Sequence, residues 1–131
     1  MIRHYISRTA IWLLAIVMIV FGIQHFRNPD SMLVFVPPFL PGGILWVYLV
    51  GIAFIVAAVA LIINRFVGFA GYLLAILLFS FVILIHLPNY REAGDAEMKQ
   101  MALISLLKDL AIGAFALFIA ANAKQQHLST V

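Results

Sequence analysis

The chain has 131 residues, of which 66% are hydrophobic and only 10% are charged, and its mean hydropathy is +1.14. A soluble globular domain of this length does not need so much apolar side chain, so the composition predicts an all-α integral membrane protein. Cysteine is absent, which excludes disulfides, thiolate metal sites and covalent haem attachment. The net charge of +3 reports membrane topology and not nucleic-acid binding.

Four apolar segments follow one another along the chain and fill it as a single domain. At about 20 residues per membrane span, the length suits four helices with short connections. The expected spans are residues 9–25, 44–63, 66–87 and 101–123, arranged as an antiparallel four-helix bundle. The first span has a basic start, as a secretory signal does, but no small-residue cleavage site follows it. We therefore expect this span to be retained.

The connections between the spans differ in character. Pro29 is expected to end the first helix, and the segment "SMLVFVPPFLPGG" after it is too apolar for a solvated loop and too rich in proline for a regular helix. We expect this segment to lie in the membrane interface or to fold back over the bundle. Asn64 and Arg65 form a short turn, whereas Pro88 ends the third span and opens the polar loop "PNYREAGDAEMKQ". The polar tail from Lys124 on is expected to be frayed.

The distribution of charge along the chain predicts its orientation. The N-terminus, the Asn64–Arg65 turn and the C-terminal tail share one side of the membrane, which carries basic residues and no acid. The basic residues of that side are Arg3, Arg8, Arg65 and Lys124. The opposite side has three basic and four acidic residues, so the bias places both termini in the cytoplasm.

The stretch "LLKDLAIG" puts two charges inside the fourth span. Lys108 and Asp109 lie about 11 Å along the helix axis from the start of that span, where an isolated charge is costly. Adjacent residues are 100° apart on a helix, so the two side chains leave from different faces. Asp109 shares the small-residue face of Gly113 and is expected to point inward. Lys108 shares an apolar face, from which it reaches the outer headgroups or folds back as the counter-ion of Asp109.

Other polar residues fall at a similar depth on the other three helices. His25 ends the first span, His86 ends the third, and Tyr48 lies about one turn into the second. All four helices can therefore offer a polar group to one outer-leaflet cluster of His25, Tyr48, His86, Lys108 and Asp109. An apolar pocket with a few convergent polar groups is the default ligand site of a helix bundle. The alternative for the single members is an interfacial role, and for Lys108 and Asp109 an ion pair that fixes helix register.

The residue types in this cluster leave its chemistry open. Two histidines and a carboxylate can form a facial metal triad. Here, however, His25, His86 and Asp109 come from three helices without local ligand spacing, so we predict no metal site. Ser105 lies on the fourth helix, but nothing in the sequence indicates an activated nucleophile or an oxyanion hole. Whether the chain is an enzyme stays undecided at this level.

The ordered features of the chain resemble the DoxX and DoxX-like family of small bacterial four-helix membrane proteins. The carriers are "FGIQHFRNP", "VPPFLPGG", "VYLVGIAFIVAAVALII", "IHLPN" and "LLKDLAIGAFAL". The resemblance implies an inner-membrane protein, and some members are linked to quinone-coupled sulfur oxidation or to membrane oxidoreductase complexes. The matching positions are His25, Pro37, Pro41, His86, Asn89, Lys108 and Asp109. Family members often carry an acid in the second span, near the position where this chain has Phe54.

Three functions follow from these features. The first is a quinone- or lipid-binding accessory subunit of a membrane oxidoreductase system, in which Asp109 and His86 bond the quinone head and handle its proton. It implies membrane lipid, other oxidoreductase subunits or a second copy as partners, and no nucleic acid. The second is a non-enzymatic scaffold that stabilises a complex, which the missing acid at Phe54 favours. The third, a small transporter or channel, is the weakest, because no broken midplane helix is evident.

Overall fold

The structure is a computed structural model in which residues 1–124 are described. Residues 125–131, which hold most of the tail that was expected to be frayed, lie outside the described residues. Every regular element in the described part is a helix, as the composition predicts. In chain order these are α1 (Ile2–Arg27), α2 (Pro29–Leu33), α3 (Ile44–Ile62), α4 (Val67–Phe81), η1 (Val82–His86), α5 (Leu87–Glu92) and α6 (Ala96–Ala121).

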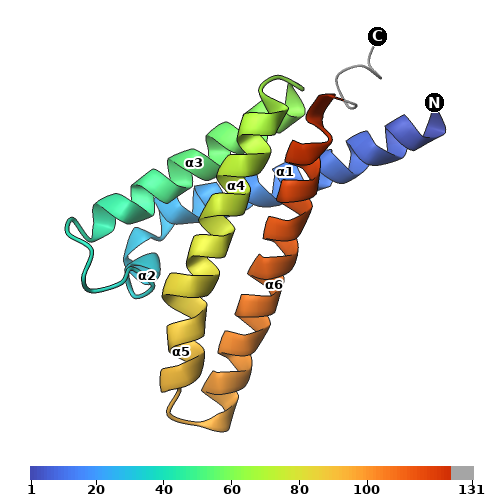
Figure 1. The fold of residues 1–131 in the computed structure, drawn as a ribbon. Coiled ribbons are helices and arrows are strands. Elements are labelled where there is room, and N and C mark those ends of the chain that lie inside the picture. Colours follow the sequence, from blue (N-terminus) through green and yellow to red (C-terminus); the bar gives the residue numbers. More distant parts are fainter. Residues whose placement is uncertain (125–131) are drawn as a thin grey trace.

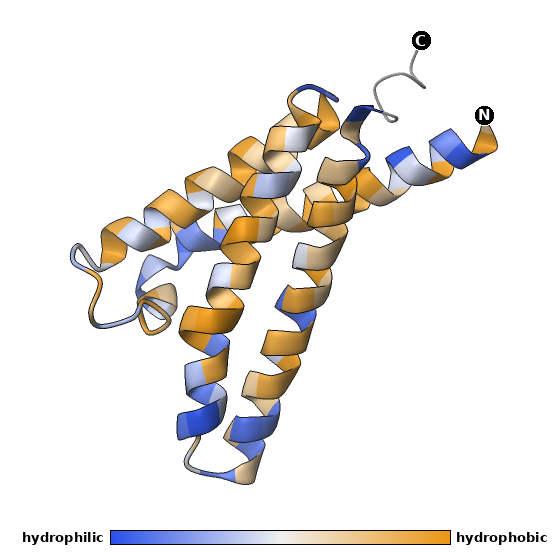
Figure 2. Ribbon diagram, in the orientation of Figure 1, coloured by the Kyte–Doolittle hydropathy of each residue, from blue (hydrophilic) through white to orange (hydrophobic). Residues whose placement is uncertain are grey.

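Four of the helical segments have the length and apolarity of membrane spans. The elements α4, η1 and α5 follow one another without a break and form one rod, Val67–Glu92. This rod, α1, α3 and α6 are each long and apolar enough to cross a membrane, which confirms the predicted multi-pass class by length and composition. Figure 2 shows apolar residues along most of each rod and hydrophilic residues near α5, at the start of α6 and in the first turns of α1.

The third span ends later than predicted, because Pro88 does not end the helix. Pro88 occupies the second position of α5, and the helix continues to Glu92. The fourth span also starts earlier, at Ala96, because the Asp95 carboxylate accepts a 2.8 Å hydrogen bond from the Met98 N–H and caps α6. The long polar loop expected here is therefore only residues 93–95.

The first connection also differs from the prediction in one part. The helix α1 ends at Arg27, just before Pro29 as expected, but Pro29 then opens the short helix α2. Proline is favoured at the first helical position, because its missing N–H would have no partner there and its φ is already helical. The remainder of the connection, residues 34–43, is irregular, and the Trp46 indole N–H donates to the Pro41 carbonyl at 2.6 Å.

The spans are arranged as two pairs. In Figure 1, α1 and α3 run side by side in opposite directions. The α4–η1–α5 rod and α6 also run side by side in opposite directions. The two pairs meet where α3 contacts α4 and at the turn that joins them. At their other ends the pairs diverge, so that α2 and α5 lie apart in Figure 1. Polar residues near α2 and near α5 are therefore carried by two separate arms.

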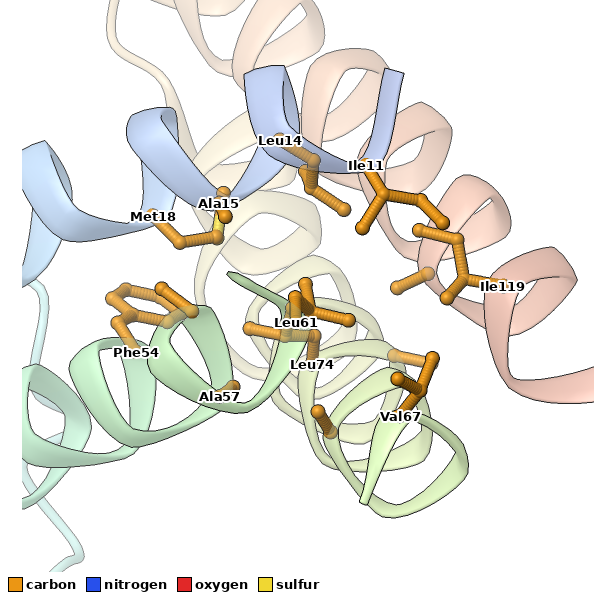
Figure 3. Close-up of a cluster of buried hydrophobic side chains, with 14 of the residues drawn as sticks. Ile11, Leu14, Ala15, Met18, Phe54, Ala57, Leu61, Val67, Leu74 and Ile119 are labelled. Carbon is orange, nitrogen blue, oxygen red and sulfur yellow. The ribbon is translucent and has the colours of Figure 1, made fainter. Parts of the chain in front are cut away.

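The core lies where the two pairs meet. Figure 3 shows Ile11 of α1, Leu61 of α3, Leu74 of α4 and Ile119 of α6 gathered at this point. All four side chains are buried, whereas no polar or charged side chain of residues 1–124 is as deeply buried. The apolar core therefore holds the pairs together at one end, and the polar candidates lie outside it.

Glycines set the close approach of the helices within each pair. A Cβ added to Gly51 of α3 would lie 2.9 Å from the His25 Cβ and 3.3 Å from the Gly22 carbonyl oxygen of α1. A Cβ added to Gly71 of α4 would lie 2.7 Å from the Ala116 carbonyl oxygen of α6. Small residues at such crossings let membrane helices pack backbone against backbone, as the small-residue spacing predicts.

Candidate functional site

One ion pair joins α6 to the third span. Nε2 of His86 lies 2.7 Å from Oδ2 of Asp109, a geometry in which the imidazole N–H donates to the carboxylate. It is the one ion pair that the structure shows within residues 1–124. The side chains are 15% and 20% exposed, so the pair lies at the edge of the α4–α6 packing and not inside the apolar core.

The local backbone around His86 is a widened helical turn. Pro88 has no N–H, and its ring would clash with the carbonyl four residues before it in a regular α-helix. In the segment η1 the Leu87 N–H instead donates to the Val82 carbonyl, five residues back, as in a π-helix. A π-turn holds one extra residue, so it changes the direction in which the side chains after it point. Pro88 therefore fixes the turn at whose end His86 faces α6.

Asp109 is positioned by the packing face of α6. The next residue of this face, Gly113, has the Phe79 ring against it, because a Cβ there would lie 2.6 Å from Phe79 Cε1. One turn further, Ala116 is buried against Gly71 of α4. The whole face is thus turned toward the third span, and Asp109 meets His86 there. Lys108 is exposed on another face and makes no ion pair within the described residues.

The position of the pair along the two helices can be measured from a contact near their connecting loop. The Lys99 ammonium lies 4.8 Å from the centre of the Tyr90 ring, and such a basic and aromatic contact is typical of a membrane interface. Along α6, Asp109 is ten residues or about 15 Å from Lys99, whereas along the third span His86 is four residues or about 6 Å from Tyr90. The pair therefore lies well inside the two apolar spans. A charged or strongly polar group at this depth requires a partner, which His86 supplies.

Each member of the pair keeps hydrogen-bonding capacity. His86 uses Nε2 and Asp109 uses Oδ2, and no further bond within residues 1–124 engages His86 Nδ1 or Asp109 Oδ1. Both side chains are also partly exposed. Asp109 Oδ1 is a hydrogen-bond acceptor, and His86 Nδ1 is an acceptor in the neutral imidazole and a donor in the imidazolium.

The other candidates of the first two spans lie in the α1–α3 pair. His25 Nδ1 lies 2.7 Å from the Phe21 carbonyl oxygen, and the His25 ring meets the Phe54 ring edge-on at 5.5 Å. Tyr48 stacks on Phe26 at 5.7 Å. No hydrogen bond in the described part of the chain links His25 or Tyr48 to His86 or Asp109, so the structure brings together two of the five clustered residues.

Asn89 lies on α5, in the last turn of the third span. It is exposed, and the described residues offer it no hydrogen-bond partner. Gln24 and Arg27 lie in the last turn of α1, where the Gln24 side-chain oxygen accepts from Asn28 Nδ2 at 2.7 Å. Both belong to the α1–α3 arm.

Two features of the site escaped the sequence analysis. The first is the π-turn, whose signal was Pro88 in an otherwise continuous apolar helix. The second is the packing role of Phe54, a residue noted above only for its missing acid: Phe54 is only 3% exposed and meets the Phe81 ring of α4 edge-on at 6.1 Å. Phe54 therefore joins the α1–α3 pair to α4, next to the start of η1. An acid at this position would lie in an aromatic environment.

The comparisons with known proteins give a family without a function. The model of the DUF8561 family, described as a domain of unknown function, matches residues 14–120. The chain belongs to this family. No curated protein and no solved structure matches the chain. The matched residues include α3, the third span, the second half of α1 and nearly all of α6, and with them both His86 and Asp109, so the candidate site lies within the part that defines the family.

Proposed function

We propose that the chain is a DoxX-like protein of the bacterial cytoplasmic membrane that binds a lipid-soluble ligand with a polar head at His86 and Asp109. A quinone is the first candidate, and the protein would serve as an accessory subunit of a membrane oxidoreductase system. The single observation that carries this proposal is the partly exposed His86–Asp109 bond between two apolar spans.

The donor set of the pair suits a quinone head. The carbonyl oxygens of a quinone accept hydrogen bonds, and the hydroxyl groups of a quinol donate them. Asp109 Oδ1 would accept from a quinol hydroxyl, and His86 Nδ1 would donate to a quinone carbonyl in the imidazolium form; neither atom has a partner in the described residues. The quinone would supply reversible two-electron chemistry, and the chain would hold the head and a proton on the imidazole or the carboxylate.

The antiparallel bundle and the cytoplasmic termini belong to the same proposal. The basic residues without an acid at the end that carries Arg3 and Arg65 support a cytoplasmic placement of that end. His86 and Asp109 would then be reached from the outer half of the bilayer. The exposed faces of the spans would contact lipid, and other subunits or a second copy are the protein partners that we propose.

A non-enzymatic scaffold is the second candidate function. Phe54 favours it, because this ring packs between the two helix pairs near the position where related families often have an acid. On this account the His86–Asp109 bond sets the register of α4 against α6 and binds nothing. The two functions differ in what Asp109 does when the fold is intact.

Native mass spectrometry of the protein released from its own membrane separates them. Wild type is compared with Asp109→Asn, and Glu97→Gln is the matched control, because it removes one negative charge from the exposed first turn of the same helix. We expect a quinone-mass adduct on wild type and on Glu97→Gln that Asp109→Asn loses. Equal adducts on all three proteins, or none on any, would overturn ligand binding at the pair and favour the scaffold.

A further inference from the structure

A second polar site lies at the opposite end of the molecule, on α1. An open hollow of about 350 Å³ is lined there by Tyr5, Arg8, Thr9, Trp12 and Leu13. These residues repeat at helical spacing, so they form one face of the first three turns of α1. The hollow shares no residue with the His86–Asp109 site, and what it binds does not depend on the function proposed above.

Arg8 is held in a fixed orientation at this hollow. Its Nη1 donates to Asn64 Oδ1 at 3.1 Å, and its Nη2 donates to the Leu61 carbonyl oxygen at 2.9 Å. Both partners belong to the end of α3, so the guanidinium also ties α1 to the following turn. A guanidinium has five N–H donors, and three of them remain for another acceptor. The bonds to α3 thus leave a pre-oriented cation beside the hollow.

The other polar groups of the lining are also hydrogen-bond donors. Within residues 1–124 the Tyr5 hydroxyl and the Trp12 Nε1–H have no hydrogen-bond partner, whereas the Thr9 hydroxyl donates to the Tyr5 carbonyl. No Asp or Glu lies in α1 or in the turn that carries Asn64. A lining with a cation, several free donors and no acid fits an anionic, acceptor-rich group such as a phosphate.

The expected position of the hollow relative to the bilayer indicates which molecule would supply the phosphate. The 26 residues of α1 span about 39 Å, which exceeds a hydrocarbon core of about 30 Å. Because the first turns of α1 carry Arg3 and Arg8, we expect these turns to extend into the headgroup region, with Arg8 close to its boundary. Trp12 and Leu13 are 46% and 60% exposed on the side of the hydrocarbon, where an acyl chain would run.

We propose that the hollow of Tyr5, Arg8 and Trp12 binds the headgroup phosphate of an acidic phospholipid. The Arg8 fork bonds the phosphate oxygens, and the Tyr5 hydroxyl and the Trp12 N–H complete the set. The indole ring and Leu13 lie along the lipid chain. Arg8 would then bond the lipid phosphate and the end of α3 at the same time.

The test uses the purified full chain in detergent and native mass spectrometry with added phosphatidylglycerol or phosphatidylcholine. We expect phosphatidylglycerol to bind wild type at least tenfold more tightly than phosphatidylcholine. Arg8→Gln is expected to lower that affinity about tenfold, because a charge-assisted contact is lost. Arg3→Gln, which removes one positive charge from the same end outside the hollow, is the matched control and should retain the affinity.

Two conservative variants protect the test against a loss of folding in Arg8→Gln. Tyr5→Phe and Trp12→Phe remove one donor each and keep an aromatic ring, and each should weaken phosphatidylglycerol about threefold, with no change in melting temperature. An equal loss in Arg3→Gln and Arg8→Gln, with no effect of the two conservative variants, would overturn the site and leave only general charge attraction. Displacement of the lipid by millimolar glycerol phosphate would overturn the lipid as the source of the phosphate.

Discussion

The two helix pairs solve the same packing problem, and within residues 1–124 only one of them has an ion pair between its helices. In the α1–α3 pair, Gly22 and Gly51 let the backbones approach, and the rings of His25 and Phe54 fill the space beside them. In the α4–α6 pair, Gly71 and Gly113 do the same, yet His86 and Asp109 are added. Close packing of two spans in this chain therefore does not need an ion pair, which is why we assign the pair a ligand.

The largest loss of stability should come from filling the close glycine contacts that both helix pairs have. In Gly71→Leu the new side chain meets the Ala116 and Ala120 backbone of α6, so one helix must shift, and we expect a loss of about 3 kcal/mol in the free energy of unfolding. Gly51→Leu should cost a similar amount in the other pair. Unfolding in mixed micelles with rising dodecyl sulfate measures both.

Gly94→Leu is the control for these variants, because nothing lies within 4 Å of a Cβ built on that residue. It should change the unfolding free energy by less than about 0.5 kcal/mol. If Gly71→Leu were as stable as this control, the α4–α6 contact described here would be wrong.

The next largest effect should come from the His86–Asp109 ion pair, which only the α4–α6 pair contains. Asp109→Leu and His86→Leu each leave one polar partner without its bond, and each should cost about 1–2 kcal/mol. The double variant removes both polar groups and replaces them with apolar side chains, so it should recover most of that loss. A double-mutant cycle from the same unfolding measurements checks this. A double variant less stable than either single variant would show that the bond is a structural requirement of the pair.

A smaller effect should follow from Pro88→Ala. The substitution restores an N–H and removes the clash that makes η1 a widened turn, so the helix becomes regular and His86 turns away from Asp109. The unfolding free energy should change by about 1 kcal/mol or less, since a helix gain offsets a lost bond. The imidazole nitrogen NMR signals of His86 in bilayers should lose the shift that the carboxylate contact causes, and signals identical to wild type would contradict the role of Pro88.

The sequence predicted the fold well where hydropathy alone decides it. Four apolar runs separated by Pro29, Asn64 and Pro88 predicted four spanning helices, because span length follows from the thickness of a bilayer. Pro88 misled the prediction of where the third helix ends, since a proline is tolerated inside a helix when a widened turn accommodates it. The start of α6 was missed because Asp95 is a local cap within a polar segment that has no hydropathy signal.

The site was predictable in part, because the position of a residue around a helix follows from its sequence number. The 100° step between helical residues placed Asp109 on the small-residue face of α6 that packs on α4. His86 faces it from the third span. Phase gives a direction around each helix, but it does not give the angle between two helix pairs. The divergence of the pairs, which leaves His25 and Tyr48 on the other arm, depends on Phe54 and on the core at the meeting point. Those contacts are tertiary and have no short sequence pattern.

The double variant His86→Leu with Asp109→Leu offers the most direct test of the central claim, that the pair serves a ligand. The measurement is the quinone and lipid content, by mass spectrometry, of wild type and the double variant extracted in equal amounts from the same host membrane. The account predicts a folded double variant that has lost the quinone-mass adduct of wild type. A folded double variant with the adduct of wild type, or a wild type without any adduct, would contradict it.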